Sequence, residues 1–576
     1  MSIPTAPSLS TELIKPTEPA DWWRGAVIYQ IYPRSFKDSN DDGVGDLPGI
    51  IGQLDYVAAL NVDAIWISPF FKSPMKDFGY DVSDYRAVDP LFGTLEDFEQ
   101  LISAAHARGI KVIIDQVISH TSDQHVWFQE SRSSRDNAKA DWYIWADPKA
   151  DGSPPNNWLS IFGGSAWQWE SRRRQYYLHN FLSSQPDLNF HEEAVQRQIL
   201  DDVEFWCRLG LDGFRFDACN FHFHDQSLRD NPPAAAGAVS SSVRADNPYS
   251  MQQHCFDKNR PENLAFLERL RGVLDRYGAI GLGEIGDEDA PPLMASYTAG
   301  NERLHMAYSF GLLTPIFSAS HIRMQGEQLE TSIGPTGGWA CWSLSNHDVP
   351  RVLSRWGGDD ADPRLAKLLL CLLGSLRGTV CLFQGEELGL PEAEVPYADI
   401  RDPYGIAFWP EYKGRDGCRT PFPWSSAAPH GGFSDAKPWL PIASTQLPRA
   451  VNIAQQDENS ILHFYRRFLA WRAHQTVLKI GSIYFFDTPE PVLMHVRSVE
   501  NAIVKSAMLC VFNLSAERIS VPVIAALTTA FPTFRRTDLT TLTGHGLTGA
   551  RFDQNNLILA PYGGLFAQLT LSSKST

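Results

Sequence analysis

Residues 94–120, TLEDFEQLISAAHARGIKVIIDQVISH, join a helix pattern directly to a buried-strand pattern. Thr94 and Asp97 stand at the N-cap and N3 positions of a capping box. Apolar residues then recur at helical spacing, namely Phe98, Leu101, Ile102 and Ala105. The apolar segment 110–120 predicts a buried strand. A helix that leads straight into such a strand is half of the repeating unit from which parallel sheets are built.

The same alternation of strand and helix continues on both sides of this stretch. Strands are predicted at 26–33, 62–70, 110–120, 213–217, 279–285, 304–310, 338–348 and 378–387. Eight strands that alternate with helices predict an α/β fold, a (β/α)8 barrel. In such a barrel the active residues lie at the carboxyl ends of the strands.

The alternation is interrupted once, and it ends before the end of the chain. Residues 121–199 are rich in Trp, Asn, Gly and Pro, which predicts a small domain inserted after the third strand. After a helix at 458–474 the patterns are those of strands, which predicts a C-terminal antiparallel β domain. The predicted parts are a mobile tail at 1–22, the barrel at 23–120 and 200–477, domain B at 121–199 and the β domain at 478–576.

The composition narrows the possible partners. The chain has 576 residues, and its formal net charge of −17 argues against nucleic acid or an anionic membrane as partner. The N-terminus lacks a basic segment followed by an apolar one, and no apolar run reaches the roughly 18 residues of a membrane span. We therefore expect a cytoplasmic protein. The eight cysteines, from Cys207 to Cys510, have no CxxC spacing and are predicted to be reduced, buried thiols.

Polar side chains end four of the predicted strands, at His120, Asp217, Glu284 and Asp348. One such acid alone would fit a structural ion pair, but four polar strand ends at one rim cost desolvation and need a use. Two carboxylates that face each other suit glycoside hydrolysis, in which one attacks the anomeric carbon and the other protonates the leaving oxygen. Arg215 lies on the same strand face as Asp217 and is expected to keep that carboxylate ionised.

Four segments in this order, DQVISH, GFRFDACNF, GEI and SNHD, resemble the ordered motifs of the α-amylase family, glycoside hydrolase family 13. QPDLN at 185–189 is similar to the extra motif of the α-glucosidase and oligo-1,6-glucosidase branch. The resemblance covers roughly residues 22–570. It implies a catalytic (β/α)8 barrel, a B domain after the third strand and a C-terminal β domain.

The resemblance also implies roles for the polar strand ends. Asp217 would be the nucleophile, Glu284 the general acid and base, and Asp348 a third carboxylate that holds sugar hydroxyls and favours the distorted ring. Arg215, His120 and His347 would bind the same glucose.

A second group of residues is implied to close the non-reducing end of the site. KDFGYD resembles the family segment in which an acid pairs with an arginine and a tyrosine stacks beneath the sugar, here Asp77 and Tyr80. The arginine lies in GRDGCRTPFPW, where Arg415 is the first candidate and Arg419 the second. Aromatic walls are matched by Phe162 and Phe181, for which a place in the core of the inserted domain is the alternative.

The segment DSNDDGVGD at 38–46 has the pattern of a cation-binding loop. Oxygen donors stand at alternate positions, namely Asp38, Asn40, Asp42, the Val44 carbonyl and Asp46. This is the start of an EF-hand-like loop, but Gly49 stands where a bidentate Glu would complete it. Oligo-1,6-glucosidase-like proteins carry a similar loop, which implies a structural Ca²⁺ or Mg²⁺; a solvated acidic turn is the alternative. Ser119 replaces the Asn that binds a different calcium in many amylases, so we do not expect that second site.

The loop at 220–260 resembles a subgroup of bacterial α-glucosidases that take short substrates and transfer glucose to alcohols. It would overhang the pocket and exclude long chains. His222 and His224 in this loop have no matching ligand set, so a zinc site is not expected.

The predicted function is a retaining α-glucosidase that releases glucose from the non-reducing end of short α-glucosides such as maltose or sucrose, with transglucosylation. Its partners would be small α-glucosides and glucosyl acceptors, without nucleic acid, membrane or organic cofactor, as a monomer or homodimer. Small Ala218, directly after the proposed nucleophile, favours α-1,4 linkages, because Val at this place goes with α-1,6 cleavage in the family. QPDLN points the other way, since it is common among α-1,6 enzymes.

Three alternatives remain open at this stage. An oligo-1,6-glucosidase and a sucrose or maltose isomerase share the same catalytic set. The RLDRD loop of sucrose isomerases is absent, and ERLHMAYSF at 302–310 occupies that region. A non-enzymatic, transporter-associated relative would lack the catalytic acids and add a membrane span.

Overall fold

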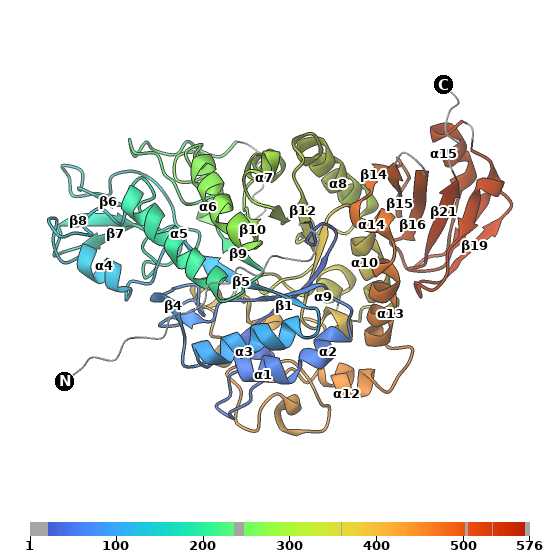
Figure 1. Cartoon of the computed structure of the whole chain (residues 1–576), viewed down its shortest axis with the longest axis horizontal. Helices are drawn as coiled ribbons and strands as arrows, with labels where there is room; N and C mark the ends of the chain where they lie inside the picture. The colour runs from blue at the N-terminus through green and yellow to red at the C-terminus, as the bar shows by residue number, and fades with distance from the viewer. Residues whose placement is uncertain are drawn as a thin grey trace, which may run out of the picture.

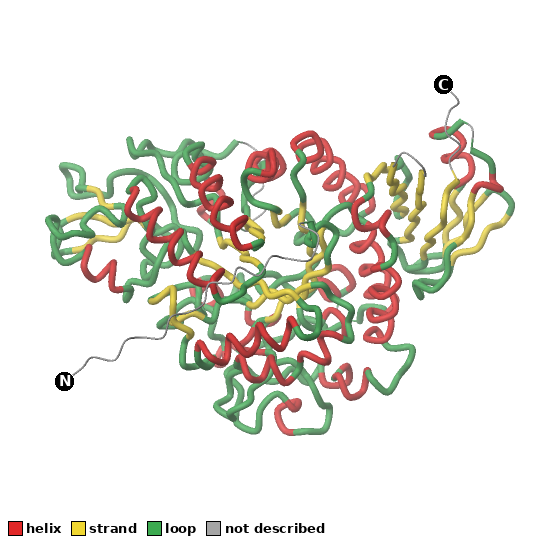
Figure 2. The backbone as a smooth tube through the Cα atoms, viewed as in Figure 1, coloured by secondary structure: helices red, strands yellow, loops and turns green. Residues whose placement is uncertain are grey.

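The structure is a computed structural model that describes residues 21–235, 243, 247–358, 360–500, 505–532 and 534–570. Its centre is a closed barrel of eight parallel strands (Figures 1 and 2), as predicted. The strands in chain order are β1 (Val27–Ile31), β2 (Ala64–Ile67), β5 (Lys111–Val117), β9 (Gly213–Asp217), β10 (Ile280–Glu284), β11 (Met306–Ser309), β12 (Ala340–Ser343) and β13 (Thr379–Phe383). Because β1 pairs with both β2 and β13, the barrel has no free edge.

Helices connect the strands and surround the barrel. They are α1 (Leu47–Gly52), α2 (Leu54–Ala58), α3 (Leu95–His106), α5 (Glu193–Arg208), α6 (Asn263–Tyr277), α7 (Ala290–Thr298), α8 (Ala319–Ile333), α9 (Val352–Gly357), α10 (Pro363–Ser375), α11 (Pro403–Ala407), α12 (Val451–Ala454), α13 (Ile461–Ala473) and α14 (Thr476–Ile480). The predicted capping box starts α3, with reciprocal hydrogen bonds between Thr94 and Asp97. The predicted apolar face of this helix is buried.

Several strands end earlier than the sequence pattern predicts, and in two of them this moves a site residue off the strand. β5 stops at Val117 and β12 at Ser343, so His120 and Asp348 lie in the loops that follow and not on the strands. After β12 the Asn346 side chain accepts hydrogen bonds from the Asp348 and Val349 amides, which turns the chain out of the sheet. Apolar content alone does not reveal this turn.

A small inserted layer is formed by the chain between β5 and α5, and it lies on the left of Figure 1. It contains α4 (Val126–Ser131) and an antiparallel sheet in the order β6 (Trp145–Ala146), β8 (Gln175–Leu178) and β7 (Trp167–Glu170). Trp158, Trp167 and Leu178 form part of its core. A hairpin of β3 (Phe71–Lys72) and β4 (Asp84–Val88) follows β2.

The C-terminal part, on the right of Figure 1, is an antiparallel β structure, as predicted. One sheet has the order β14 (Ser482–Phe485), β15 (Val492–Glu500), β16 (Lys505–Asn513), β21 (Gly564–Thr570) and β18 (Leu539–Thr541). The other has the order β17 (Ile519–Val521), β20 (Asn556–Leu559) and β19 (Ala550–Asp553), and the helix α15 (Val523–Ala530), which was not predicted, packs on it. The domain boundaries drawn from the sequence stay predictions.

Other predictions concern single features of the chain. All eight cysteines are free, and all except Cys255 are buried, as predicted. Within the described ranges no helix is long and apolar enough to cross a membrane. Residues 1–20 of the predicted tail, and residues 236–242 and 244–246 of the long loop, lie outside the described residues.

Candidate active site

The two predicted catalytic carboxylates lie side by side. Asp217 is the last residue of β9 and Glu284 the last of β10, and these strands pair in the barrel. Only 11% of the Asp217 side chain and 14% of the Glu284 side chain are exposed. Arg215 contacts both: Nη1 lies 2.7 Å from Asp217 Oδ1, and Nη2 forms an ion pair with Glu284 Oε1.

Arg215 has a third carboxylate partner that the sequence analysis missed. Asp115 lies opposite Arg215 in the register of β5 and β9, and its Oδ1 is 2.8 Å from Arg215 Nη1. The signal was present, because Asp115 is a charged residue within the predicted buried strand, and it is buried with its neighbours. One buried guanidinium therefore serves three carboxylates.

Burial has the largest effect on the pKa values of Asp217 and Glu284. Desolvation raises the pKa of Glu284 to about 8; Arg215 opposes the rise, whereas Asp217 and Asp348 add to it. Burial also raises the pKa of Asp217, to about 6, although Arg215 lowers it. Arg215 therefore favours the ionised form of Asp217, in the expected direction, while the loss of water acts against it.

Asp348 lies in the loop after β12 and is held by two arginines. Its Oδ1 is 3.2 Å from Arg415 Nη1 and 2.9 Å from Arg419 Nη2. Its Oδ2 is 3.3 Å from His347 Nε2. Burial would raise the pKa of Asp348, but these three side chains outweigh it and hold the pKa below its usual range.

Arg415 is the arginine that contacts Asp77. Its Nη2 is 2.9 Å from Asp77 Oδ1 and 2.8 Å from Asp402 Oδ1. Arg419 instead donates to the His347 carbonyl at 2.6 Å and to Asp348. Asp402 was not foreseen, because it lies in an irregular segment after β13 that has no periodic pattern.

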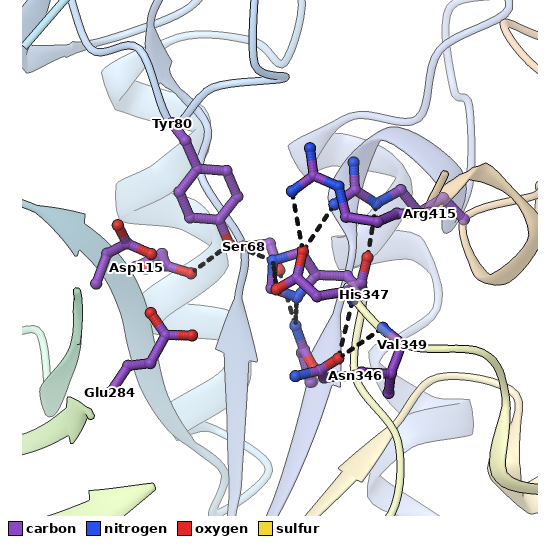
Figure 3. A network of polar contacts seen from close by, with 12 residues as sticks. Ser68, Tyr80, Asp115, Glu284, Asn346, His347, Val349 and Arg415 are labelled. Atoms are coloured by element: carbon purple, nitrogen blue, oxygen red, sulfur yellow. Dashed lines mark hydrogen bonds and ion pairs between the residues drawn. The ribbon is translucent and has the colours of Figure 1, made fainter. Parts of the chain in front are cut away.

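Tyr80 and His347 form a stacked pair next to these ions (Figure 3). Their ring centroids are 5.5 Å apart, and Tyr80 Oη contacts His347 Nε2. Tyr80 Oη also donates to Asp115 Oδ2 at 3.1 Å, which joins this pair to the Arg215 group. Gln30 Nε2, 2.8 Å from His347 Nδ1, holds the other side of the imidazole.

The loop after β5 and the motif QPDLN meet at His120. His120 Nε2 lies 3.0 Å from the Tyr80 carbonyl, and the Phe181 ring is 5.0 Å away. Gln185, for which the sequence analysis proposed no role, donates to Asp77 Oδ2 at 3.1 Å and lies 3.3 Å from His120 Nε2. Phe162 is 6.0 Å from Phe181.

Both of these aromatic residues are partly exposed beside the polar group. Neither Phe162 nor Phe181 is fully buried, and the Arg415 guanidinium lies 5.5 Å from the Phe162 ring. Phe181 is also 5.6 Å from Phe221, in the loop after β9. The structure therefore brings all the predicted substrate-binding residues to one rim of the barrel, where each contacts at least one other residue of the group.

The loop at 38–46 binds its own backbone. Asp38 accepts hydrogen bonds from the amides of Asn40, Asp41 and Gly43. Asp46 accepts from Ser39 and Gly49, and so caps α1. Among the residues that the structure describes, no group of three or more His, Cys, Asp or Glu side chains could hold a metal ion. The carboxylate and amide oxygens suit a hard cation, and in this fold they accept hydrogen bonds from amides of the same loop.

The two histidines of the long loop are explained by packing. His222 is buried and its Nδ1 lies 2.9 Å from Asn263 Oδ1, while His224 is buried against His191 and Trp158. Burial lowers the pKa of both, to about 4 for His222 and about 3 for His224. Both are therefore neutral in the fold.

Comparison with known proteins gives one family. The model of the alpha amylase catalytic domain matches residues 30–481. The chain is 53% identical over 565 residues to a "probable alpha-glucosidase" of Rhizobium meliloti strain 1021, with 97% of this chain and 99% of the relative covered. It is 37% identical over 541 residues to the oligo-1,6-glucosidase of Heyndrickxia coagulans, with 87% and 93% covered.

A solved structure agrees with these relatives. The alpha-glucosyl transfer enzyme XgtA matches with a TM-score of 0.90 and 57% identity, over 95% of this chain and 99% of that one. The similarity thus extends over the barrel, the inserted layer and the C-terminal sheets. With the barrel, its polar rim and the matched sequence in agreement, the chain belongs to the α-amylase family and is a glycoside hydrolase.

Proposed function

We propose that this chain is a retaining α-glucosidase that releases glucose from the non-reducing end of short α-glucosides and passes it to water or to an acceptor hydroxyl. The observation that carries the proposal is Arg215, buried between two carboxylates at the ends of neighbouring strands. Two carboxyl groups with different proton affinities, side by side, suit a double displacement.

The proposed nucleophile is Asp217, and the proposed acid and base is Glu284. Near pH 7 Asp217 has the lower pKa and is mostly ionised, whereas Glu284 is mostly protonated. In the first step the Asp217 carboxylate bonds to the anomeric carbon, while the bond from that carbon to the leaving oxygen breaks and Glu284 gives its proton to this oxygen. In the second step Glu284 takes a proton from water or an acceptor hydroxyl, whose oxygen displaces Asp217 from the anomeric carbon.

The proposed glucose pocket has one closed end. The ion pairs of Arg415 with Asp77 and Asp402 lie beside the Tyr80–His347 pair, and these groups are buried. A closed polar end supports binding of a single terminal glucose, with hydroxyls held by Asp77, His120, His347 and Asp348. The proposed aromatic walls are Phe162 and Phe181.

The long loop supports a preference for short substrates. Asn247 of this loop donates to the Ile161 carbonyl at 2.8 Å and to Tyr404 Oη at 3.0 Å. The Tyr404 ring is 5.2 Å from Phe162, so the loop is attached next to the proposed wall of the site. We therefore propose maltose and sucrose as substrates, rather than long glucans.

The first test of the function is the configuration of the product. Wild-type enzyme should release α-glucose first, as followed by NMR in the first moments of maltose hydrolysis, and Asp217→Ala should lower kcat by more than about a thousandfold with an unchanged circular dichroism spectrum. Product analysis with sucrose distinguishes hydrolysis and transfer from isomerisation. Initial release of β-glucose would refute the double displacement.

A further inference from the structure

A partly buried polar cluster lies beside the catalytic carboxylates and joins the loops that follow them. It consists of Asn220, Lys258, Asn259, Gly286 and Asp287, and is called here the Lys258 cluster. Asn220 comes three residues after Asp217, and Gly286 two residues after Glu284. Lys258 and Asn259 come from the far end of the long loop. No role in the proposed function has been given to any of these five residues.

Lys258 is the cation of the cluster, and only 3% of it is exposed. Its Nζ donates to the Gly286 carbonyl at 3.2 Å and lies 3.2 Å from Asp287 Oδ2. The rings of Phe221 and Tyr249 lie 5.6 and 5.7 Å from the ammonium nitrogen. Desolvation would raise the pKa of Asp287, but the Lys258 charge and the hydrogen bonds from the Asp289 amide and from Asn259 outweigh it and hold the pKa below its usual value.

Asn259 ties the same loops together with its side chain and backbone. Its Nδ2 donates to Asp287 Oδ2 at 2.5 Å, and its amide nitrogen donates to the Asn220 carbonyl at 2.8 Å. Asn220 Nδ2 donates both to Asn259 Oδ1, at 2.8 Å, and to the Gly286 carbonyl, at 3.1 Å. The Gly286 carbonyl therefore accepts hydrogen bonds from two side chains, Asn220 and Lys258.

The cluster continues contacts that already reach the acid–base residue. The Cys219 amide donates to the Glu284 carbonyl at 3.2 Å, and the Ala218 amide donates to Glu284 Oε2 at 3.0 Å. Beyond these two hydrogen bonds, the Lys258 cluster forms the next set of contacts between the two loops. Burial of an ammonium group is costly unless its hydrogen bonds are made, so the bonds to Gly286 and Asp287 must form together.

We propose that Lys258 is a positioning residue for the Glu284 carboxyl: it holds Gly286 and Asp287 against the loop after Asp217 and so sets Glu284 at the leaving oxygen. This inference rests on the proposed function, in which Glu284 is the proton donor. A small displacement of such a donor costs about a hundredfold in rate. Loss of the cluster should therefore affect proton transfer more than the attack by Asp217, because the Lys258 side chain itself bonds to the loop after Glu284.

The test compares two substrates that differ in their need for a proton. The leaving group of 4-nitrophenyl α-glucoside departs without protonation, whereas the glucose that leaves maltose needs the proton of Glu284. In Lys258→Met, kcat/KM for maltose, which reports the steps up to departure of the leaving group, should fall by about 10- to 100-fold, while kcat/KM for the nitrophenyl substrate should change less than about threefold. Lys258→Arg, which keeps the charge, should recover most of the maltose activity.

Two further variants keep the test decisive. Lys139→Met removes an ion pair of similar geometry with Glu130 in the inserted layer and should leave both substrates unchanged. If Lys258→Met does not fold, Asn259→Gly removes the side-chain contacts and keeps the left-handed backbone, φ 59°, and should show the same selective loss. Equal losses on both substrates would overturn the positioning role alone. Absence of turnover by the wild type would overturn the proposed function as well.

Discussion

At the residue scale, Ala218 is constrained by its backbone and by its neighbour. Its φ is +42°, in the left-handed region that β-branched residues avoid, and its amide donates to Glu284 Oε2 at 3.0 Å. The residue is buried, so a larger side chain has little free space. The position therefore favours a small residue for reasons of conformation as well as of substrate shape.

We predict that Ala218→Val lowers the ratio of kcat/KM for maltose to kcat/KM for isomaltose. In the proposed site this residue borders the leaving sugar, and added methyl groups would press on an α-1,4-linked ring. The expected change is about 10- to 100-fold, as for other methylene-scale changes in a pocket. The measurement is steady-state kinetics on both disaccharides.

The control for this prediction is Ala218→Gly. Glycine accepts φ +42° without strain and removes the methyl group, so the ratio should stay in favour of maltose. A wild type that prefers isomaltose would contradict the α-1,4 assignment, and a ratio that Val does not move would contradict the role of Ala218.

The two catalytic carboxylates predict a bell-shaped pH profile. Activity should rise as the pH passes about 6, because Asp217 must lose its proton to attack, and fall as it passes about 8, because Glu284 must keep its proton. The measurement is kcat/KM for maltose against pH. With 4-nitrophenyl α-glucoside, whose leaving group needs no proton, the fall in wild-type kcat/KM at high pH should be absent; a fall that persists would mean that it does not report the proton donated by Glu284.

Some residues of the site were recognisable in the sequence and others were not. Asp217, Glu284 and Arg215 follow a strand pattern, so their position at the barrel rim could be predicted. Asp402 and Gln185 contribute through contacts with Arg415 and Asp77 that join distant parts of the chain. Spacing within a single sequence carries no information on such partners, so they needed the structure.

At the element scale, short loops place groups that the strands alone do not. The Asn346 turn carries Asp348 back to Arg415 and Arg419 after β12 has ended. The existence and order of the strands were predictable from apolar runs, and so was the end of β9 at Asp217. The end of β12 was not, because the Asn346 side chain turns the chain there through hydrogen bonds to the backbone. The same kind of hydrogen bond closes the loop at 38–46.

We predict that this loop binds Ca²⁺ or Mg²⁺ for stability and not for catalysis. It lies after β1 and contains no group placed for proton transfer in the site. After treatment with a chelator, added cation should raise Tm, because a ligand that binds only the folded state stabilises it. Differential scanning calorimetry with each ion measures the effect.

The matched variant is Asp42→Asn, which keeps the Oδ1 acceptor for the Val44 amide and removes the charge. It should lose the cation-dependent rise in Tm while kcat of the folded enzyme stays unchanged. If wild-type Tm does not respond to either ion, the loop is held by its hydrogen bonds alone. If chelation stops turnover of enzyme that is still folded, the stabilising role is wrong.

At the scale of the whole molecule, the barrel gathers residues that are far apart in the chain. The contact between Asp77 and Arg415 spans 338 positions, and the closed order of strands explains how these positions meet at one rim. The C-terminal sheet is joined to the barrel through buried Arg497, which donates to the carbonyls of Ser375 and Leu376 at 2.8 and 2.7 Å. The periodicity of the sequence predicted the barrel and the C-terminal sheets. It did not predict the contact of Arg497 with the Ser375 and Leu376 carbonyls, which joins them.

The sharing of Arg215 has a consequence for the timing of the reaction. Glu284 holds its proton partly because Asp217 beside it is negative. In the proposed reaction the first step converts Asp217 into a neutral ester, so Glu284 loses this repulsion and has a larger share of the Arg215 charge to itself. Its pKa must then fall, and the group that has just acted as an acid becomes a base when the second step requires one. The site resets itself once the ester is cleaved, because the negative charge then returns to Asp217.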